Sequence, residues 1–356
     1  MKPRFLFCVV GVGAGNTTRN LAILRELQSI GDCEILIAAQ GNARKLLSQH
    51  YKTIGLHDIS YSTSGKFSPL SVIKSNLGFP YRFWQNMKAS ERIMRDFKPD
   101  LVVADSDFYC LRPARRLGLK LAAINNSALI VEFIRADGTL PSNCRFSYNV
   151  IERSDYWLQR RYPQRVLCPD AGIGIPLPKK FVPIPPMVRP DIVPLTEPGD
   201  EIVVLTSGSG LDVDTIDLTK LKNQKIRMLG TRLTKVPDGA QFVGFTLDVM
   251  EHMRRAKVLV IQGGFSSLSE ALKLRVPTVI IPIANHAEQW VNGRVVEKLG
   301  LGRCARDAAH AGDEVMHIIE NYDQYWKTAQ AIDAPTDGHI VAARNLWEWA
   351  HAKTLD

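Results

Sequence analysis

The chain has 356 residues, 45% of them hydrophobic, and a formal net charge of +9. This length suits two domains of ordinary size, and the apolar fraction excludes a disordered chain. Because no apolar run reaches the roughly 18 residues that span a bilayer, the sequence predicts no transmembrane helix. The six cysteines are scattered without a CxxC pair, which favours the reducing cytoplasm.

The positive charge belongs to the first half of the chain. Residues 1–170 contain 24 Lys and Arg against 14 Asp and Glu, whereas residues 171–356 contain 21 against 22. A basic surface of this kind attracts an anionic substrate molecule, such as the acceptor of a transferred group, or an anionic membrane leaflet. An ordinary solvated surface is the alternative. No motif of a known nucleic-acid module is present, so we expect no nucleic acid partner. These features predict a cytoplasmic protein, with peripheral contact to the inner membrane face as one hypothesis.

Strand-like and helix-like segments alternate through the first half. Apolar runs predict strands at 5–10, 33–39, 54–59, 101–104 and 122–125. Amphipathic patterns predict helices that begin near residues 17, 44 and 82, and residues 60–80 are typical of a long loop. Alternation of this kind indicates a parallel, doubly wound sheet.

A glycine loop, GVGAG at residues 11–15, follows the first strand and opens a helix. Dinucleotide binding is one hypothesis for such a loop, but two features argue against it. Asn16 stands where the fingerprint requires a third glycine, and the second strand ends in Ala38-Ala39-Gln40, without an acid for a ribose. We therefore expect no NAD cofactor.

Two carboxylates, Asp105 and Asp107, follow the strand at 101–104. Parallel sheets bind their ligands at this end, so either aspartate could deprotonate an acceptor hydroxyl, and we favour Asp105. The spacing is also that of a metal-binding DxD, but two carboxylates alone make a poor site, and we expect no metal. The structural alternative is that one aspartate caps the next helix.

Nine prolines between residues 169 and 198 separate the two halves. Because proline breaks helices and cannot donate to a sheet, this stretch predicts a semi-rigid connector outside the core. The alternation then restarts, with strands at 201–205, 225–229, 241–243 and 258–261 and a helix at 248–257. We predict a first domain over 1–185, a second over 186–335, and a C-terminal helix over 336–356 that packs back toward the first domain.

The second half carries a pattern that predicts an anion site. A buried strand ends in a double glycine, and two serines then open a helix. Glycine has no Cβ, so a ligand can approach this backbone closely, and the helix N-terminus attracts negative charge. A phosphate is the usual ligand of such a site. The residues predicted to bind it are Gly263, Gly264, Ser266 and Ser267.

Polar side chains follow that could bind the rest of a nucleotide sugar. Glu270 lies about one turn into the helix, where a carboxylate can accept hydrogen bonds from the vicinal hydroxyls of a ribose. Glu288 and Gln289 follow the next strand and are suited to sugar hydroxyls. His286 lies beside them, as a sugar or phosphate contact or as a structural residue that bonds the backbone.

The order of these residues resembles the nucleotide-sugar site of GT-B glycosyltransferases related to MurG and the plant monogalactosyldiacylglycerol synthases. The shared positions are the glycine pair, the serines and Glu270, followed by Pro277, Pro282, Glu288-Gln289 and Asn292. The resemblance implies the GT-B fold, in which two doubly wound Rossmann-like domains face each other across a cleft.

The resemblance also assigns roles outside this run. Phe245 and Thr246 match the loop that holds the base in relatives. Gly208 and Ser209 match a loop whose amides reach the diphosphate, although a plain tight turn is the alternative. Gly13, Gly15 and Thr17 match the acceptor-side loop. Relatives commonly have a catalytic His where this chain has Asn16, and asparagine cannot accept a proton, which is why we look to Asp105 for the base.

These inferences together predict an inverting, metal-independent glycosyltransferase. It would move a sugar from a nucleotide diphosphate sugar, a UDP-sugar in our hypothesis, to a hydroxyl of a glycan, lipid or small molecule. The donor is a co-substrate, so no cofactor is expected. One alternative is a UDP-sugar epimerase, disfavoured because only His50 and His57 lie in the first half. The other is a non-catalytic, nucleotide-sugar-binding relative, which an Asp105 that points away from the cleft would favour.

Overall fold

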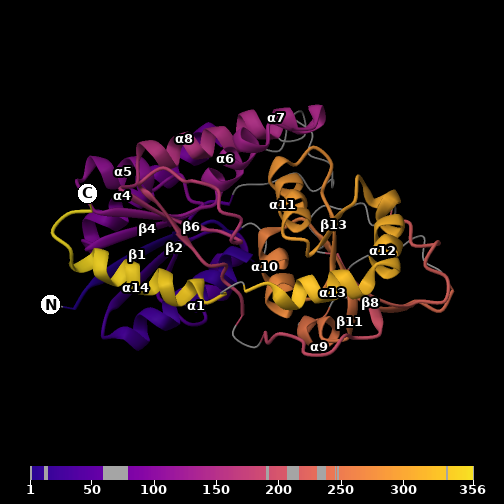
Figure 1. Cartoon of the computed structure of the whole chain (residues 1–356). Helices are drawn as coiled ribbons and strands as arrows, with labels where there is room; N and C mark the ends of the chain where they lie inside the picture. The colour runs from indigo at the N-terminus through magenta and orange to yellow at the C-terminus, as the bar shows by residue number, and fades with distance from the viewer. Residues whose placement is uncertain are drawn as a thin grey trace.

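A computed structural model describes residues 2–11, 15–58, 79–189, 192–206, 216–230, 238–244, 246, 248–333 and 336–355. Two parallel sheets, each covered by helices, form two domains that lie side by side (Figure 1). The predicted α/β fold with two doubly wound domains is confirmed.

The first sheet has the strand order β3-β2-β1-β4-β5-β6-β7, with every pairing parallel. Its strands are β1 (Arg4–Val9), β2 (Glu34–Ala39), β3 (Thr53–Gly55), β4 (Leu101–Asp105), β5 (Leu121–Ile124), β6 (Arg165–Pro169) and β7 (Phe181–Ile184). The order reverses between β1 and β4, and parallel sheets bind ligands beyond the strand ends at such a switch point.

The proline-rich connector contributes to the core, contrary to our prediction. Its residues Phe181–Ile184 form β7, which pairs with β6 and buries Phe181 and Ile184. Pro183 is tolerated because β7 is the edge strand, where one face of the backbone needs no ladder donor.

Helices cover both faces of the first sheet. They are α1 (Gly15–Ile30), α2 (Gly41–Leu47), α4 (Phe79–Phe97), α5 (Leu111–Arg116), α6 (Ser127–Asp137), η1 (Ser142–Cys144), α7 (Arg145–Ser147), the π-helix η2 (Tyr148–Glu152) and α8 (Arg153–Arg161). The predicted loop at 60–80 lies almost wholly outside the described residues, and its last residue, Pro80, belongs to α4.

The second sheet has the order β10-β9-β8-β11-β12-β13 and is also parallel. Its strands are β8 (Glu201–Leu205), β9 (Lys225–Leu229), β10 (Gln241–Gly244), β11 (Ala256–Gln262), β12 (Thr278–Ile281) and β13 (Gly302–Cys304). Its helices are α9 (Val249–Met253), α10 (Phe265–Leu274), α11 (Ala287–Lys298), η4 (Ala308–His310), α12 (Ala311–Glu320) and α13 (Tyr322–Ala331). The switch point here lies between β8 and β11.

The helix predicted at 248–257 is shorter than expected. It ends at Met253, and Ala256 already belongs to β11, where it pairs with Glu201 of β8. Pairing with a central strand therefore takes precedence over helical continuation, because it buries the apolar run that starts at Ala256.

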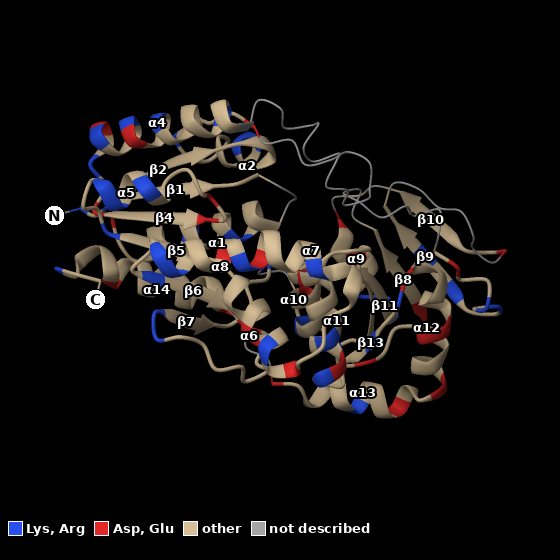
Figure 2. Cartoon of the chain, turned by 90° about the horizontal axis from the view of Figure 1, so that it is seen from above, with Lys and Arg blue, Asp and Glu red and all other residues tan. Residues whose placement is uncertain are grey.

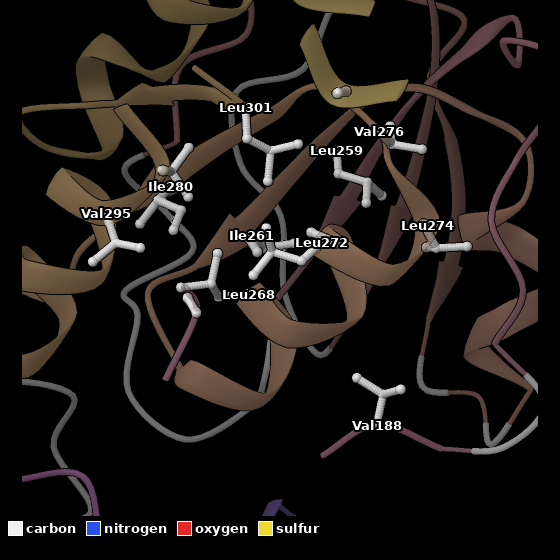
Figure 3. Close-up of a cluster of buried hydrophobic side chains, with 14 of the residues drawn as sticks. Val188, Leu259, Ile261, Leu268, Leu272, Leu274, Val276, Ile280, Val295 and Leu301 are labelled. Atoms are coloured by element: carbon white, nitrogen blue, oxygen red, sulfur yellow. The ribbon is translucent and has the colours of Figure 1, made fainter. Parts of the chain in front are cut away.

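The second domain has a continuous apolar core beneath α10 (Figure 3). Leu259 and Ile261 of β11 meet Leu268 and Leu272 of α10, and all four are almost completely buried. Val188 of the connector packs on the same cluster. Burial of such side chains contributes roughly 1.5–3 kcal/mol each, so the strand end and the helix start that carry the glycine pair are held rigidly.

The last helix, α14 (Gly338–His351), returns to the first domain, where it lies along α1 (Figure 1). Trp347 stacks on Phe5 of β1 at a ring-centroid distance of 6.3 Å, and Leu346 is buried in the first domain's core. The Lys120 ammonium donates to the carbonyl oxygens of Trp349 and Ala352.

Figure 2 colours the charged residues along the ribbon. Basic residues mark α5 and acidic residues mark α12, whereas α4 carries both signs. The six cysteines are free thiols. No helix within the described ranges combines the length and apolarity needed to cross a bilayer.

Candidate functional site

The N-termini of α1 and α10 meet where the two domains face each other. A Cβ added to Gly15, the first residue of α1, would lie 2.3 Å from the Ser266 Oγ in the first turn of α10. Each helix N-terminus leaves N–H groups without an intrahelical acceptor and carries partial positive charge. Two such ends at one place favour an anionic ligand between the domains.

The two glycines of the predicted anion site have different surroundings. A Cβ on Gly264, the residue that caps α10, would meet no described atom within 4 Å, and Ser266 beside it is exposed. Gly263 instead packs against Gln289, whose Cβ would lie 2.7 Å from an added Cβ. Its carbonyl accepts a 2.7 Å hydrogen bond from Asn292. Gly264 is therefore the glycine that a ligand can approach, and Gly263 fixes α11 against the strand end.

Glu270 lies at the site but has a partner within the chain. Its Oε1 accepts from the Arg189 Nε at 3.1 Å, and the two side chains are 18% and 30% exposed. Arg189 belongs to the connector between the domains. A ribose that bonds to Glu270 would therefore compete with Arg189.

The residues predicted to contact the sugar lie at the start of α11. The Glu288 Oε1 accepts from the Asn126 side chain of the first domain at 3.2 Å. The Gln289 Oε1 accepts from the Ile283 backbone N–H at 2.9 Å, which leaves its amide NH₂ for a ligand. The buried His286 Nδ1 has no hydrogen-bond partner among the described residues, and burial lowers the pKa of this imidazole.

Asp105 is buried within a network of charged and amide groups. Asp105 is 0% exposed, and the Arg19 guanidinium donates hydrogen bonds to both of its carboxylate oxygens. Asn20 also donates to the carboxylate. Arg19 in turn interacts electrostatically with Glu288 of the second domain. Both carboxylate oxygens of Asp105 are therefore bonded within the first domain, and Arg19 links this network electrostatically to the second domain.

Asp107 has the structural role that the sequence left open. It is fully buried, and its Oδ1 accepts from the Cys110 backbone N–H at 2.9 Å, just before α5. Burial raises the pKa of Asp107 to about 6, because no cation compensates the desolvation of the charged form. Asp107 therefore binds the backbone of the turn that precedes α5, whose N-cap residue is Cys110.

The remaining predicted residues divide into two groups. Gly13, Gly208, Ser209 and Phe245 lie outside the described residues. Thr246 accepts from the Asp248 backbone N–H at 3.1 Å, a local turn contact. Asn16 donates to the Val10 carbonyl at 3.4 Å, and Thr17 is 2% exposed.

Sequence reasoning missed several residues that complete this site. Arg19 and Asn126 come from the first domain, and Arg189 comes from the connector. Arg19 could have been identified from the sequence, because it lies one helical turn after Gly15 and follows the same glycine loop. Nothing in the sequence indicates Asn126 or Arg189, since only tertiary packing brings them to Glu288 and Glu270.

A cavity of about 250 Å³ lies on another side of α11. Trp290 and Arg294 of α11 and Asn143 of η1 are among the residues that line it. Gly264 and Glu270 are not, so this cavity is separate from the glycine-containing strand end.

Comparisons with known proteins agree with this geometry. A family model described as glycosyl transferase family 1 matches residues 3–321. An uncharacterized glycosyltransferase of Methanosarcina acetivorans is 27% identical over 330 residues, which cover 84% of this chain and 85% of that protein. A UDP-N-acetylglucosamine–N-acetylmuramyl-(pentapeptide) pyrophosphoryl-undecaprenol N-acetylglucosamine transferase of Exiguobacterium sibiricum is 24% identical over 343 residues, 86% of each chain.

Solved structures show the same architecture. MurG of Acinetobacter baumannii matches with a TM-score of 0.66 at 14% sequence identity, over 97% of this chain and 99% of that one. At this identity the match demonstrates the shared fold. The resemblance to the MurG group is thereby confirmed. The chain belongs to glycosyl transferase family 1 and is a glycosyltransferase of the GT-B fold.

Proposed function

We propose that this glycosyltransferase moves a sugar from a UDP-sugar to an acceptor hydroxyl, with inversion at the anomeric carbon and without a metal ion at the diphosphate. The observation that carries the proposal is the contact between Gly15 and Ser266, which brings two helix N-termini to one place beside the open Gly264. Preorganised N–H groups there can stabilise the charge of a departing diphosphate.

The donor would occupy the second domain. Its diphosphate would lie on Gly264 and the first N–H groups of α10, at Ser266 and Ser267. Its ribose would bond to Glu270 after displacing Arg189, which holds that carboxylate at 3.1 Å. Its sugar would lie at the start of α11.

The acceptor would bind on the side of α1. Its hydroxyl oxygen would form a bond to the anomeric carbon while the bond from that carbon to the diphosphate oxygen breaks. The hydroxyl proton would pass to a carboxylate base. For Asp105 to be this base, Arg19 must first release one of its oxygens, since the guanidinium bonds to both. Approach of the acceptor is the event that we expect to reorganise this pair.

The donor assignment is tested by calorimetry with UDP, UDP-glucose, UDP-galactose, UDP-N-acetylglucosamine and dTDP, in buffer with EDTA. UDP compounds should bind, and Glu270→Ala should weaken them roughly 10- to 100-fold, the value of a hydrogen bond to a charged group. Glu251→Ala, which alters an exposed acid on α9, serves as the matched control. Binding of dTDP alone, or binding only with added Mg²⁺, would contradict the proposal.

Inversion is tested on the reaction product. With the donor that binds best and a panel of glycan, lipid and small-molecule acceptors, we expect NMR to show the anomeric configuration opposite to that of the donor. A product that retains the donor's configuration would exclude a single displacement.

The basic first domain supports a further proposal about the acceptor's location, namely contact with an anionic membrane. Tyr81 and Trp84 of α4 are 64% and 50% exposed, and Lys88 lies over the Trp84 ring. Aromatic and basic groups together favour the interface of an anionic bilayer. Sedimentation with phosphatidylserine vesicles should carry the protein down, and Trp84→Ser with Lys88→Ser should reduce that fraction. Equal sedimentation with neutral vesicles would contradict the proposal.

A further inference from the structure

Three side chains that can ligate a metal converge where α11 meets the first domain. They are Glu152, at the end of the π-helix η2, and His286 and Glu288, at the start of α11. One potential ligand atom from each lies within 4.8 Å of the others. The two domains already touch here, because the Ala287 backbone N–H donates to the Ser147 Oγ at 3.0 Å.

The cluster lacks internal partners although it is largely buried. Glu152 is 5% exposed, and none of the described residues forms a hydrogen bond or ion pair with its carboxylate. The His286 Nδ1 is buried and also has no hydrogen-bond partner. No hydrogen bond joins any two of the three side chains. Such unpaired polar groups are costly in a protein interior, so a group that bridges them would remove the cost.

The surroundings of the cluster favour a cation over an anion. Asp155 adds a third carboxylate, which interacts with both Glu152 and Glu288. The Arg19 guanidinium, which interacts electrostatically with Glu288, is bonded to both oxygens of Asp105. Within the described residues, none of the three carboxyl groups forms an ion pair.

The state of His286 also suits a metal ligand. Its buried Nδ1 forms no hydrogen bond with any described residue, so this nitrogen can serve as a ligand. Asn126 fixes one oxygen of Glu288 and leaves the other for coordination. A mixed set of one imidazole and two carboxylates suits Zn²⁺ or Mn²⁺ better than Mg²⁺ or Ca²⁺, which prefer oxygen alone.

We propose that Glu152, His286 and Glu288 bind one Zn²⁺ or Mn²⁺ ion that links the two domains. Ligand atoms about 2.1 Å from a tetrahedral ion lie roughly 3.4 Å apart, so modest side-chain rotations close the 4.8 Å span. The ion would hold the start of α11 against η2. The ion site is separate from the diphosphate site at α10 but adjoins the sugar position proposed at the start of α11, and the inference does not depend on the identity of the nucleotide.

The test uses the full chain after removal of metal with EDTA and gel filtration. Isothermal titration with Zn²⁺ and Mn²⁺ should show one site per chain, with weaker binding of Mg²⁺ and Ca²⁺, and elemental analysis should confirm the stoichiometry. Glu152→Gln should weaken binding by more than the roughly 10-fold that loss of an outer-shell partner costs. Glu251→Gln, which removes an exposed carboxylate on α9, should leave it unchanged.

Stability measurements separate ligation from a structural role. Glu152→Gln replaces a buried, unpaired carboxyl group with an amide of the same shape, so we expect the metal-free variant to melt close to the wild-type temperature and to respond less to metal. A variant that binds metal as tightly as the wild type, or a wild type that binds none, would overturn the proposal. The UDP titration in EDTA reports on the donor site independently, because it requires no metal.

Discussion

In both domains a candidate site lies at the carboxyl ends of parallel strands, but the polar groups at the two sites differ in how far they are already bonded within the chain. In the first domain, the charged groups behind the strand ends have partners within the chain: Asp105 bonds to Arg19 and Asn20, and Asp107 bonds to the Cys110 backbone. In the second, an added Cβ on Gly264 would meet no described atom within 4 Å, and Ser266 is exposed. The donor side thus has an accessible position for a diphosphate, with a partly exposed ion pair at Glu270, whereas on the acceptor side both oxygens of the candidate base are bonded within the domain.

The largest effect should come from breaking the first domain's ion pair. Arg19→Met leaves the Asp105 carboxylate buried without its partner, so we expect a loss of about 3–5 kcal/mol in the free energy of unfolding by urea. The double variant Arg19→Met with Asp105→Asn removes both charges and should recover much of that loss. If the single and double variants lose the same free energy of unfolding, the Arg19–Asp105 ion pair does not account for the stability of the first domain.

Asp107 gives the first domain a pH dependence. Its pKa of about 6 in the folded state exceeds the unfolded value of about 3.9. The folded state therefore holds this proton more tightly, so the stability that this group contributes is fully present below pH 4 and is lost as pH rises through 6, a change of about 3 kcal/mol. Asp107→Asn should abolish this component in unfolding measured between pH 4 and 7. Asp96→Asn, which alters an exposed residue of α4, should retain this pH-dependent component.

On the donor side, filling the open position should block binding without harming the fold. Gly264 has φ of −68° and ψ of 135°, which any residue adopts, and an added Cβ meets no described atom within 4 Å. Gly264→Val should lower UDP affinity at least 100-fold, about 2.7 kcal/mol, with a stability change of about 1 kcal/mol or less. Ser267→Ala, which keeps the backbone amides, should lose far less. Unchanged UDP affinity in Gly264→Val would show that the diphosphate does not bind at Gly264.

The smallest expected effect concerns the ion pair between Arg189 and Glu270 on the donor side. Arg189 and Glu270 are partly exposed, so their ion pair contributes about 1 kcal/mol or less to stability. Arg189→Ala removes one competitor of the ribose at Glu270 and should tighten UDP binding by up to about fivefold in calorimetry. Weaker binding in this variant would indicate that Arg189 contacts the nucleotide itself.

The sequence predicted the fold well because its signals are local. Alternating apolar runs and amphipathic helices indicated both parallel sheets, and the glycine pair marked the end of β11. The β7 strand was missed because Pro183 reads as a strand breaker, and only the edge position of β7 makes it acceptable.

The site was harder to predict, since its contacts join residues far apart in the chain. Glu270 and Glu288 were identified from their spacing, but their partners Arg189 and Asn126 come from other elements. Asp105 illustrates the limit most clearly. Its position at a strand end was evident from the sequence, whereas the burial and the Arg19 contact that occupy its oxygens depend on how α1 packs across β4.

The return of α14 to the first domain has a consequence for synthesis on the ribosome. Phe5 and Gly31, which pack against Trp347, emerge more than 300 residues before that tryptophan. At translation rates of about 5–20 residues per second, the interval lasts roughly 15 to 60 s. All strands of both domains are made before Trp347, so the second domain can fold while the apolar surface that α14 covers on the first domain is still exposed.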